Sequence, residues 1–169
     1  MPQVASRVTL KGNPVNLVGS EPQTGQTAPD CTLTANDLSV VKLSSFKGKK
    51  IILSVVPSLD TPICDLQTKR FNKEASALND VIVLTISMDL PFAQKRWCGA
   101  TGSDKIKTLS DHREASFGQA YGVLIKDLRI LARAIFIIDE KWSLRYKQIV
   151  PEIAQEPNYE EALQAIKKI

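Results

Sequence analysis

Residues 51–64 have the sequence Ile-Ile-Leu-Ser-Val-Val-Pro-Ser-Leu-Asp-Thr-Pro-Ile-Cys, and the rest of the chain can be placed around them. The first six residues are apolar and rich in β-branched side chains, which predicts a buried strand over 51–56. The following residues predict a helix over 62–79, because its apolar side chains lie close to one helical face: Ile63, Leu66, Phe71, Ala75 and Leu78. Residues 57–61 then form the turn from strand to helix, and Cys64 lies where the helix begins.

The position of Cys64 favours a reactive thiol. Thr61 can serve as the N-cap and Pro62 as the first helical residue, where its missing N–H does no harm. The sulfur then lies beside amide groups without intrahelical partners, at the positive end of the helix dipole. Such a place favours the thiolate, the reactive form of cysteine. The alternative is a small apolar core residue, because free cysteine is among the most buried residue types.

Arg133 is the candidate for a positive charge beside this sulfur. Making an ordinary thiol mostly ionised takes roughly 3.4 kcal/mol, whereas a helix terminus typically contributes about 0.3–1 kcal/mol. Arg133 lies in the apolar segment 131–136, where a guanidinium is costly unless it is paired. If this strand shares a sheet with 51–56, Arg133 can reach the turn. The alternative is an arginine that extends to solvent or pairs with a structural carboxylate.

Two residues of the turn are further candidates for the site. Thr61 has two compatible roles, because it can cap the helix and can also donate a hydrogen bond to the sulfur or to a substrate oxygen. Pro57 has no chemistry of its own, and we expect it to shape the turn and to shield the sulfur from water.

Cys98 is the second reactive candidate. It lies near the end of a short helix predicted from Pro91 to Trp97, with Gly99 as the C-cap. The alternative is a half-buried helix cysteine. A bond between Cys98 and Cys64 requires Cα atoms within about 7 Å, so one or both helix ends would unravel if the cysteines are further apart at rest.

The remaining candidates for chemistry are weak. Cys31 has no nearby charge pattern or helix start, and we expect it to be a packing residue. His112 is the one histidine, and none of the three cysteines belongs to a C-x-x-C pair. Zinc sites usually need three or four closely spaced nitrogen and sulfur ligands, so no metal is expected.

The order of predicted elements indicates the fold class. Residues 3–18 predict a β-hairpin with its turn at 12–14, and residues 19–30 predict a loop. Further strands are predicted at 31–33, 40–43, 81–87, 106–109, 134–138 and 142–149, and further helices at 114–121 and from Pro157-Asn158 onward. Strand 51–56, helix 62–79 and strand 81–87 form a βαβ unit with a right-handed crossover, and a ββα unit follows. We therefore predict an α/β sandwich of the thioredoxin architecture, a mixed sheet flanked by helices, in one domain over 1–169 with an N-terminal hairpin extension within 1–18.

Composition excludes several other classes. The 169 residues are 43% hydrophobic and 24% charged, as in ordinary soluble proteins. The net charge of +4 is scattered, which favours neither nucleic acid nor an anionic membrane as partner. No apolar run approaches the roughly 20 residues of a membrane span, and no signal peptide is evident. We expect a cytoplasmic protein, in which cysteines are more often catalytic or metal-binding than structural.

The segment 57–64 resembles the P-x-x-x-T-x-x-C signature of peroxiredoxins, and more narrowly that of the bacterial thiol peroxidase subfamily. Six other stretches are similar to that subfamily, so the resemblance runs from near residue 11 to near residue 169: 11–15, 87–94, 98–100, 120–123, 131–134 and 156–159. It implies a thioredoxin fold with an N-terminal hairpin, a homodimer, and an atypical two-cysteine peroxidase of antioxidant defence. The family is reduced by thioredoxin and uses no bound metal, haem or flavin.

The resemblance also implies roles for the candidate residues. Cys64 would be the peroxidatic cysteine, whose thiolate attacks hydrogen peroxide or an organic hydroperoxide, becomes a sulfenic acid and releases water or alcohol. Cys98 would be the resolving cysteine and would close a disulfide with Cys64 in the same chain. Thr61 and Arg133 would hold the sulfur and polarise the O–O bond, while Pro57 shields the site.

The chain departs from this pattern in three places. Residues 122–130 form a shorter segment before Arg133 and lack the glycines expected there. His112 stands where family members often carry a bulky residue, so we assign it no catalytic role. Cys31 matches no family cysteine.

Two other functions are compatible with a reactive Cys64. The first is a cysteine hydrolase, which would need His112 within hydrogen-bond reach of the sulfur. The second is a chaperone-like or redox-sensing protein of the same fold, which would react with peroxide without turning over with thioredoxin.

Overall fold

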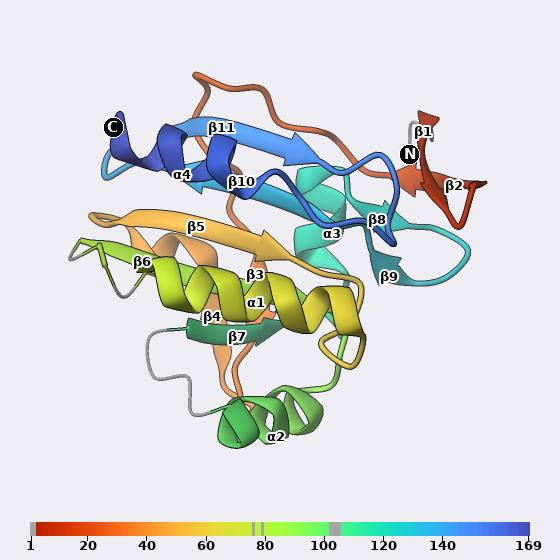
Figure 1. Ribbon diagram of the computed structural model, residues 1–169, viewed down its shortest axis with the longest axis horizontal. Coiled ribbons are helices and arrows are strands. Elements are labelled where there is room, and N and C mark those ends of the chain that lie inside the picture. The colour runs from red at the N-terminus through yellow and green to blue at the C-terminus, as the bar shows by residue number, and fades with distance from the viewer. Residues whose placement is uncertain (1–2, 76, 79, 102–105) are drawn as a thin grey trace.

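The computed structural model describes residues 3–75, 77, 78, 80–101 and 106–169 (Figure 1). The described elements are, in chain order, β1 (Gln3–Leu10), β2 (Asn13–Val18), β3 (Thr32–Thr34), β4 (Val40–Lys42), the 3-10 helix η1 (Leu43–Phe46), β5 (Lys50–Val55), α1 (Pro62–Ala75), β6 (Val81–Ser87), α2 (Pro91–Thr101), β7 (Ile106–Ser110), α3 (Ser116–Tyr121), β8 (Leu124–Ile125), β9 (Ile130–Leu131), β10 (Ala134–Ile138), β11 (Leu144–Ile149) and α4 (Tyr159–Lys167). The predicted strands at 81–87 and 134–138 coincide with β6 and β10.

The larger sheet has seven strands in the order β11-β10-β5-β6-β7-β3-β4. Strands β5, β6 and β7 run parallel, and the other neighbours are antiparallel. Because β5 lies between β6 and β10 and is covered on both faces, residues 51–55 are all buried, which explains their nearly continuous apolar sequence. The predicted βαβ unit β5-α1-β6 is confirmed.

Alternate residues of the sheet contribute to two different apolar layers. Ile52 belongs to a cluster with Phe71 of α1 and Ile166 of α4. Leu53 belongs to the larger core, together with Phe117 of α3. Since successive side chains of a strand point to opposite faces, α1 and α4 cover one face of the sheet and α3 covers the other (Figure 1).

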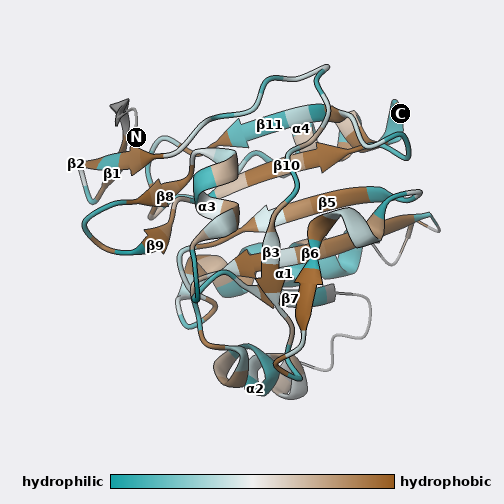
Figure 2. Ribbon diagram, turned by 180° about the vertical axis from the view of Figure 1, so that it is seen from behind, coloured by the Kyte–Doolittle hydropathy of each residue, from teal (hydrophilic) through white to brown (hydrophobic). Residues whose placement is uncertain are grey.

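A second sheet, which the sequence did not predict, contains the N-terminal hairpin. Its order is β1-β2-β8-β9, and Leu17 of β2 pairs with Ile125 of β8. Strands β8 and β9 come from the segment 122–130 and residue 131, and they are drawn in brown, hydrophobic colours in Figure 2. Leu17, Ile125 and Leu131 are all part of the larger core. The hairpin is therefore anchored to the segment that leads directly into Arg133.

The predicted hairpin is confirmed, but its predicted turn at 12–14 is wrong. The turn is formed by Lys11 and Gly12, whose φ angles are 51° and 81°. Two consecutive positive φ angles are typical of a two-residue type I′ turn, which matches the twist of the flanking strands. Asn13 and Pro14 already belong to β2 and pair with Leu10 and Thr9.

Three predicted helix bounds need correction. Helix α1 ends at Ala75 rather than residue 79, although residues 76 and 79 lie outside the described residues. Helix α2 continues to Thr101, so the prediction of Gly99 as its C-cap is wrong. Helix α3 begins at Ser116 rather than at residue 114. The buried carboxylate of Asp111 accepts hydrogen bonds from the Phe117 and Gly118 amides in the first turn of this helix.

The fold class is the predicted one, a thioredoxin-like α/β sandwich with an N-terminal hairpin. Within the described part of the chain, no helix is both long and apolar enough to cross a bilayer. The larger sheet brings the start of α1 and the start of β10 to the same edge, and the candidate residues meet there.

Candidate active site

Cys64 is the third residue of α1, as predicted, and its side chain is fully buried. It forms a small apolar cluster with Val56 and Leu59, and Trp97 of α2 packs against this cluster. None of Cys64, Cys98 and Cys31 forms a disulfide. The reduced protein therefore holds the Cys64 sulfur under an apolar cover at the mouth of a helix.

Arg133 supplies the positive charge beside this sulfur. Its Nη2 donates to Cys64 Sγ at 3.3 Å, its Nη1 donates to Gln67 Oε1 at 2.9 Å, and its Nε donates to the Ile153 carbonyl oxygen at 2.9 Å. Only 2% of its surface is exposed. A buried guanidinium is tolerated when its donors are paired, and here three different nitrogen atoms each have a partner. The expectation that Arg133 reaches the turn is confirmed, and the solvent-facing alternative is excluded.

The strand register explains how residues 69 positions apart meet. Strand β10 runs antiparallel to β5, and Ala134 is paired with Val55. Arg133 therefore stands just before the first paired residue of β10, beside the carboxyl end of β5, where the turn to α1 starts. This is the sheet neighbourhood that the βαβ and ββα order predicts.

Gln67 is a site residue that the sequence reasoning missed. Among the side chains of α1 whose burial is described, four are fully buried, the later three lie three, four and seven positions after the first, and only two of the four are apolar: Cys64, Gln67, Thr68 and Phe71. Gln67 accepts from Arg133, and its Nε2 donates to Ser54 Oγ at 2.9 Å. The predicted apolar face was partly wrong, since Leu66 is 50% exposed. A glutamine three residues after Cys64 was the available signal, because that spacing puts both on one helical face.

The other polar residue of this face closes the helix around Cys64. The Thr68 hydroxyl donates to the carbonyl oxygen of Cys64 at 2.8 Å. Serine and threonine hydroxyls commonly bond one turn back in this way within helices. The Thr68 hydroxyl thus fixes the main chain of Cys64, and the hydrogen bond from Arg133 fixes its sulfur.

Thr61 and Pro57 both lie in the turn. Of the two roles predicted for Thr61, the hydrogen bond to the sulfur is not formed in this state. The Thr61 hydroxyl donates to the Ser58 carbonyl oxygen at 3.1 Å, so its single proton is not directed at the sulfur in this state. Its residue is exposed and directly precedes Pro62. Pro57 is buried and follows β5 after one intervening residue, Val56.

Cys98 lies inside α2, one residue after Trp97, and is half-buried. Its sulfur is 3.3 Å from the Thr108 hydroxyl of β7, and that hydroxyl donates to Asn36 Oδ1 at 3.0 Å. Cys98 is thus packed on the sheet as part of a regular helix.

Cys31 is a packing residue of the core, as predicted. Cys31 belongs to the larger core with 5% of its surface exposed. Burial, together with the nearby Asp111 and Asp30, raises the pKa of the Cys31 thiol far above its usual range, which keeps this thiol protonated. His112 lies in the turn after β7, and among the described residues no hydrogen bond joins its side chain to Cys64.

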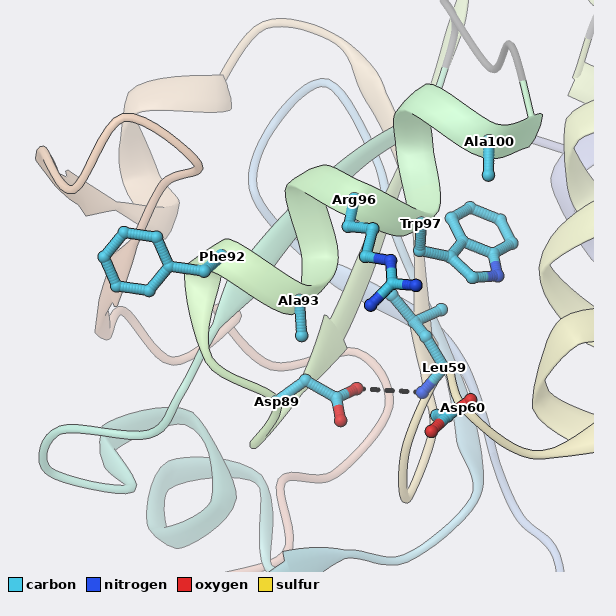
Figure 3. A pocket seen from close by; sticks show the side chains of 8 residues that line it. All are labelled: Leu59, Asp60, Asp89, Phe92, Ala93, Arg96, Trp97 and Ala100. Carbon is cyan, nitrogen blue, oxygen red and sulfur yellow. Dashed lines mark hydrogen bonds between the residues drawn. The ribbon is translucent and has the colours of Figure 1, made fainter.

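A half-open cavity of about 560 Å³ lies between the turn and α2 (Figure 3). Its lining contains apolar side chains, two carboxylates and one guanidinium: Leu59, Asp60, Asp89, Phe92, Ala93, Arg96, Trp97 and Ala100. Leu59 and Trp97 also cover Cys64. The cavity is therefore separated from the sulfur by these two side chains.

Comparisons with known proteins agree with this geometry. The family model described as Redoxin matches residues 23–163. The chain is 55% identical over 163 residues to a thiol peroxidase of Oceanobacillus iheyensis, which covers 96% of this chain and 99% of that protein. It is 54% identical over 164 residues to a thiol peroxidase of Bacillus subtilis, which covers 97% of this chain and 98% of that protein.

Solved structures show the same fold. A peroxiredoxin-like protein from Aquifex aeolicus matches with a TM-score of 0.90 and 42% sequence identity over 99% of both chains. A thiol peroxidase from Chromobacterium violaceum matches with a TM-score of 0.88 over 95% of both chains, at 19% identity.

Proposed function

Because this chain belongs to the thiol peroxidases of the Redoxin family, we propose that it reduces hydroperoxides with Cys64 as the attacking nucleophile. The observation that carries the proposal is the 3.3 Å contact between Arg133 Nη2 and Cys64 Sγ at a helix N-terminus. The Arg133 guanidinium places a positive charge and a hydrogen-bond donor directly at this sulfur. The same cation can then stabilise negative charge that develops on the peroxide oxygens.

The first step is a two-electron transfer from sulfur to peroxide. The Cys64 thiolate attacks the terminal oxygen of ROOH, an S–O bond forms and the O–O bond breaks. The leaving RO⁻ takes a proton and departs as alcohol, or as water when the substrate is hydrogen peroxide. Cys64 is left as a sulfenic acid. We assign Thr61 to the substrate oxygens in this step, after its hydroxyl leaves the Ser58 carbonyl, and Pro57 to the exclusion of water.

The second step joins the two cysteines. The Cys98 thiol attacks the sulfenic sulfur, an S–S bond forms and the hydroxyl leaves as water. Because Cys64 is buried and Cys98 lies inside α2, the start of α1 or the middle of α2 unwinds before this step. A dithiol protein of the thioredoxin type then reduces the disulfide by exchange and becomes oxidised itself.

The proposal extends to the working form of the protein. We place it in the cytoplasm, where Cys64 and Cys98 start as thiols. We treat residues 1–169 as one domain that acts as a unit. This is supported by the hydrogen bond that the Thr9 amide of the N-terminal hairpin donates to the Pro151 carbonyl oxygen at 2.8 Å, because it joins the hairpin to the C-terminal part of the chain. A homodimer is supported by three large apolar side chains that are half-exposed or more, near the site: Leu66, Leu90 and Phe92.

Counting free thiols during one turnover tests this function. The reduced protein should show three thiols, and one equivalent of peroxide should leave one, with Cys64 joined to Cys98 within the monomer. Three thiols after peroxide would exclude a peroxidase, and two would mean that Cys64 oxidises without Cys98. Thioredoxin-linked turnover separates an enzyme from a redox sensor, since a sensor reacts once and stops.

Cysteine variants assign the two roles. Cys64→Ser should abolish turnover and leave Cys98 reduced after peroxide treatment. Cys98→Ser should still consume about one equivalent of peroxide and stall at sulfenic acid or beyond. Sustained thioredoxin-linked turnover by Cys98→Ser would contradict the resolving role.

A further inference from the structure

Asp89 connects the turn before Cys64 to the end of β6. Its Oδ1 accepts a hydrogen bond from Ser58 Oγ at 2.7 Å. Its Oδ2 accepts from the Leu59 amide at 2.8 Å, the bond drawn as a dashed line in Figure 3, and from Ser87 Oγ at 2.7 Å. A charged acceptor makes such bonds shorter and stronger than neutral ones. One carboxylate therefore fixes two successive residues of the turn.

The same network continues into the helix that carries Cys98. Ser87 Oγ accepts from Gln94 Nε2 of α2 at 3.0 Å, and Gln94 Nε2 also donates to the Leu109 carbonyl oxygen of β7 at 3.0 Å. Gln94 is fully buried. It lies four residues before Cys98, so both side chains are on the face of α2 that contacts β7. An unbroken path of hydrogen bonds thus runs from the turn at Ser58 to the helix of the second cysteine.

We propose that Asp89 is a positioning residue that holds the turn closed for the first step of the reaction and must release it for the second. The inference rests on the proposed function of Cys64 and Cys98. Asp89 acts through Ser58 and Leu59, whose placement keeps Cys64 at the mouth of α1 beside Arg133.

The two steps need opposite states of the turn. Peroxide attack needs Cys64 Sγ at Arg133, so it is fastest while the turn is closed. Disulfide formation needs Cys64 to leave its buried position, so it is fastest when the turn is open. A residue that stabilises only the closed state must therefore accelerate the first step and slow the second, because it shifts the population between two states.

Single-turnover kinetics of Asp89→Asn test this inference. The amide keeps the size of the side chain but replaces one acceptor oxygen by a donor, which cannot accept from Ser58 or Leu59. Rapid quenching gives both rates: dimedone labels the sulfenic acid, and mass spectrometry follows the Cys64–Cys98 disulfide. We expect the first step to become about tenfold slower and the second about tenfold faster, as the loss of one charged hydrogen bond permits. The variant should also need more peroxide to reach the sulfinic acid, since its sulfenic acid is consumed sooner.

A matched control is Asp60→Asn. Asp60 is an exposed carboxyl in the same turn and lines the same cavity, so the charge change is the same while the Asp89 bonds remain. We expect both of its rates to match the unmodified protein. Ser58→Ala removes one of the Asp89 bonds without a charge change and should move both rates in the same directions as Asp89→Asn, by a smaller factor. If Asp89→Asn does not fold, the two rates of Ser58→Ala alone test the positioning role of Asp89.

The outcomes separate the inference from the function it rests on. If both steps slow together, or if neither rate changes in Asp89→Asn and Ser58→Ala, Asp89 has no positioning role. If the unmodified protein itself forms no Cys64–Cys98 disulfide, the proposed function fails and the inference fails with it. Opposite changes in the two rates, present in both variants and absent in Asp60→Asn, establish the role.

Discussion

The indole Nε1 of Trp97 donates a 3.0 Å hydrogen bond to Asp65 Oδ1. These two residues are the chain neighbours of Cys98 and Cys64, so one bond joins α2 to α1 directly beside both cysteines. The indole also packs against the cluster that contains Cys64. In the reduced protein, Trp97 is therefore part of the cover of Cys64, and we expect it to leave this position in the proposed disulfide step.

Trp97 should report the change of state by fluorescence. We expect the emission to shift to longer wavelength on oxidation, because the indole leaves its apolar contacts and becomes more hydrated. The other tryptophan, Trp142, lies in the turn before β11 with 5% of its surface exposed. The shift should thus persist in Trp142→Phe and vanish in Trp97→Phe, with disulfide formation checked by thiol counting. A shift that survives in Trp97→Phe would contradict the predicted movement.

Replacing Arg133 should slow the attack on peroxide. Arg133→Ala removes the donor to Cys64, and the loss of one donor to a developing charge typically costs about 10²-fold in rate. Arg133→Lys keeps a charge but lacks the planar fork that reaches Gln67 and Cys64 together, so we expect an intermediate rate. The measurement is the second-order rate constant for Cys64 oxidation, with folding checked by circular dichroism. An unchanged constant in Arg133→Ala would remove the residue from the mechanism.

Gln67→Met should couple a loss of stability to a loss of rate. Methionine has a similar length but offers no amide oxygen to Arg133, so a buried guanidinium N–H loses its partner. We expect the free energy of unfolding to fall by about 1–3 kcal/mol and Cys64 oxidation to slow, because the guanidinium is less well held. Urea unfolding and stopped-flow oxidation measure the two effects. Gln164→Met, on an exposed position of α4, is the control. A destabilised variant with an unchanged rate would leave Gln67 a purely structural residue.

Asp139 should make the protein sensitive to acid. Burial raises its pKa, but hydrogen bonds from the Ser143 and Lys141 amides and from Arg145 outweigh burial and lower the pKa overall. A carboxyl with a lowered folded-state pKa stabilises the fold above its ordinary value near 3.8, and this contribution is lost as the pH falls through the folded-state pKa. We expect Asp139→Asn to be less stable at pH 7 and the difference to narrow below about pH 4. Unfolding free energies between pH 3 and pH 7 measure this, with exposed Asp127→Asn as a control. A difference that stays constant with pH would mean that the charge of Asp139 is not responsible.

Much of the site could be predicted from the chain because it depends on local order. A buried strand followed by Pro57 and Pro62 places Cys64 in the first turn of a helix, and sheet neighbourhood brings Arg133 to it. Gln67 was missed because a search for an apolar helix face passes over a buried polar residue whose partner lies 66 positions away. Asp89 was missed for the same reason, since its partners at 58 and 59 are distant in sequence.

Other features were beyond the reach of sequence patterns. Strands β8 and β9 have two residues each, which is too short for any alternation to show. Their pairing depends on the hairpin at the other end of the chain. The direction of the Thr61 hydroxyl is likewise set by the fold of the turn rather than by residue type.

Cys31 and Cys64 are both buried, but Cys31 is held protonated by burial and by the nearby Asp111 and Asp30, which raise the pKa of its thiol, whereas the proposed function makes Cys64 and Cys98 the reacting pair. This difference between Cys31 and the other two thiols exists only in the folded protein. In an unfolded chain exposed to an oxidant, three thiols allow three pairings, and two of them would capture Cys31. Either would block correct refolding, so the chain should regain activity after denaturation only if it is kept reduced throughout.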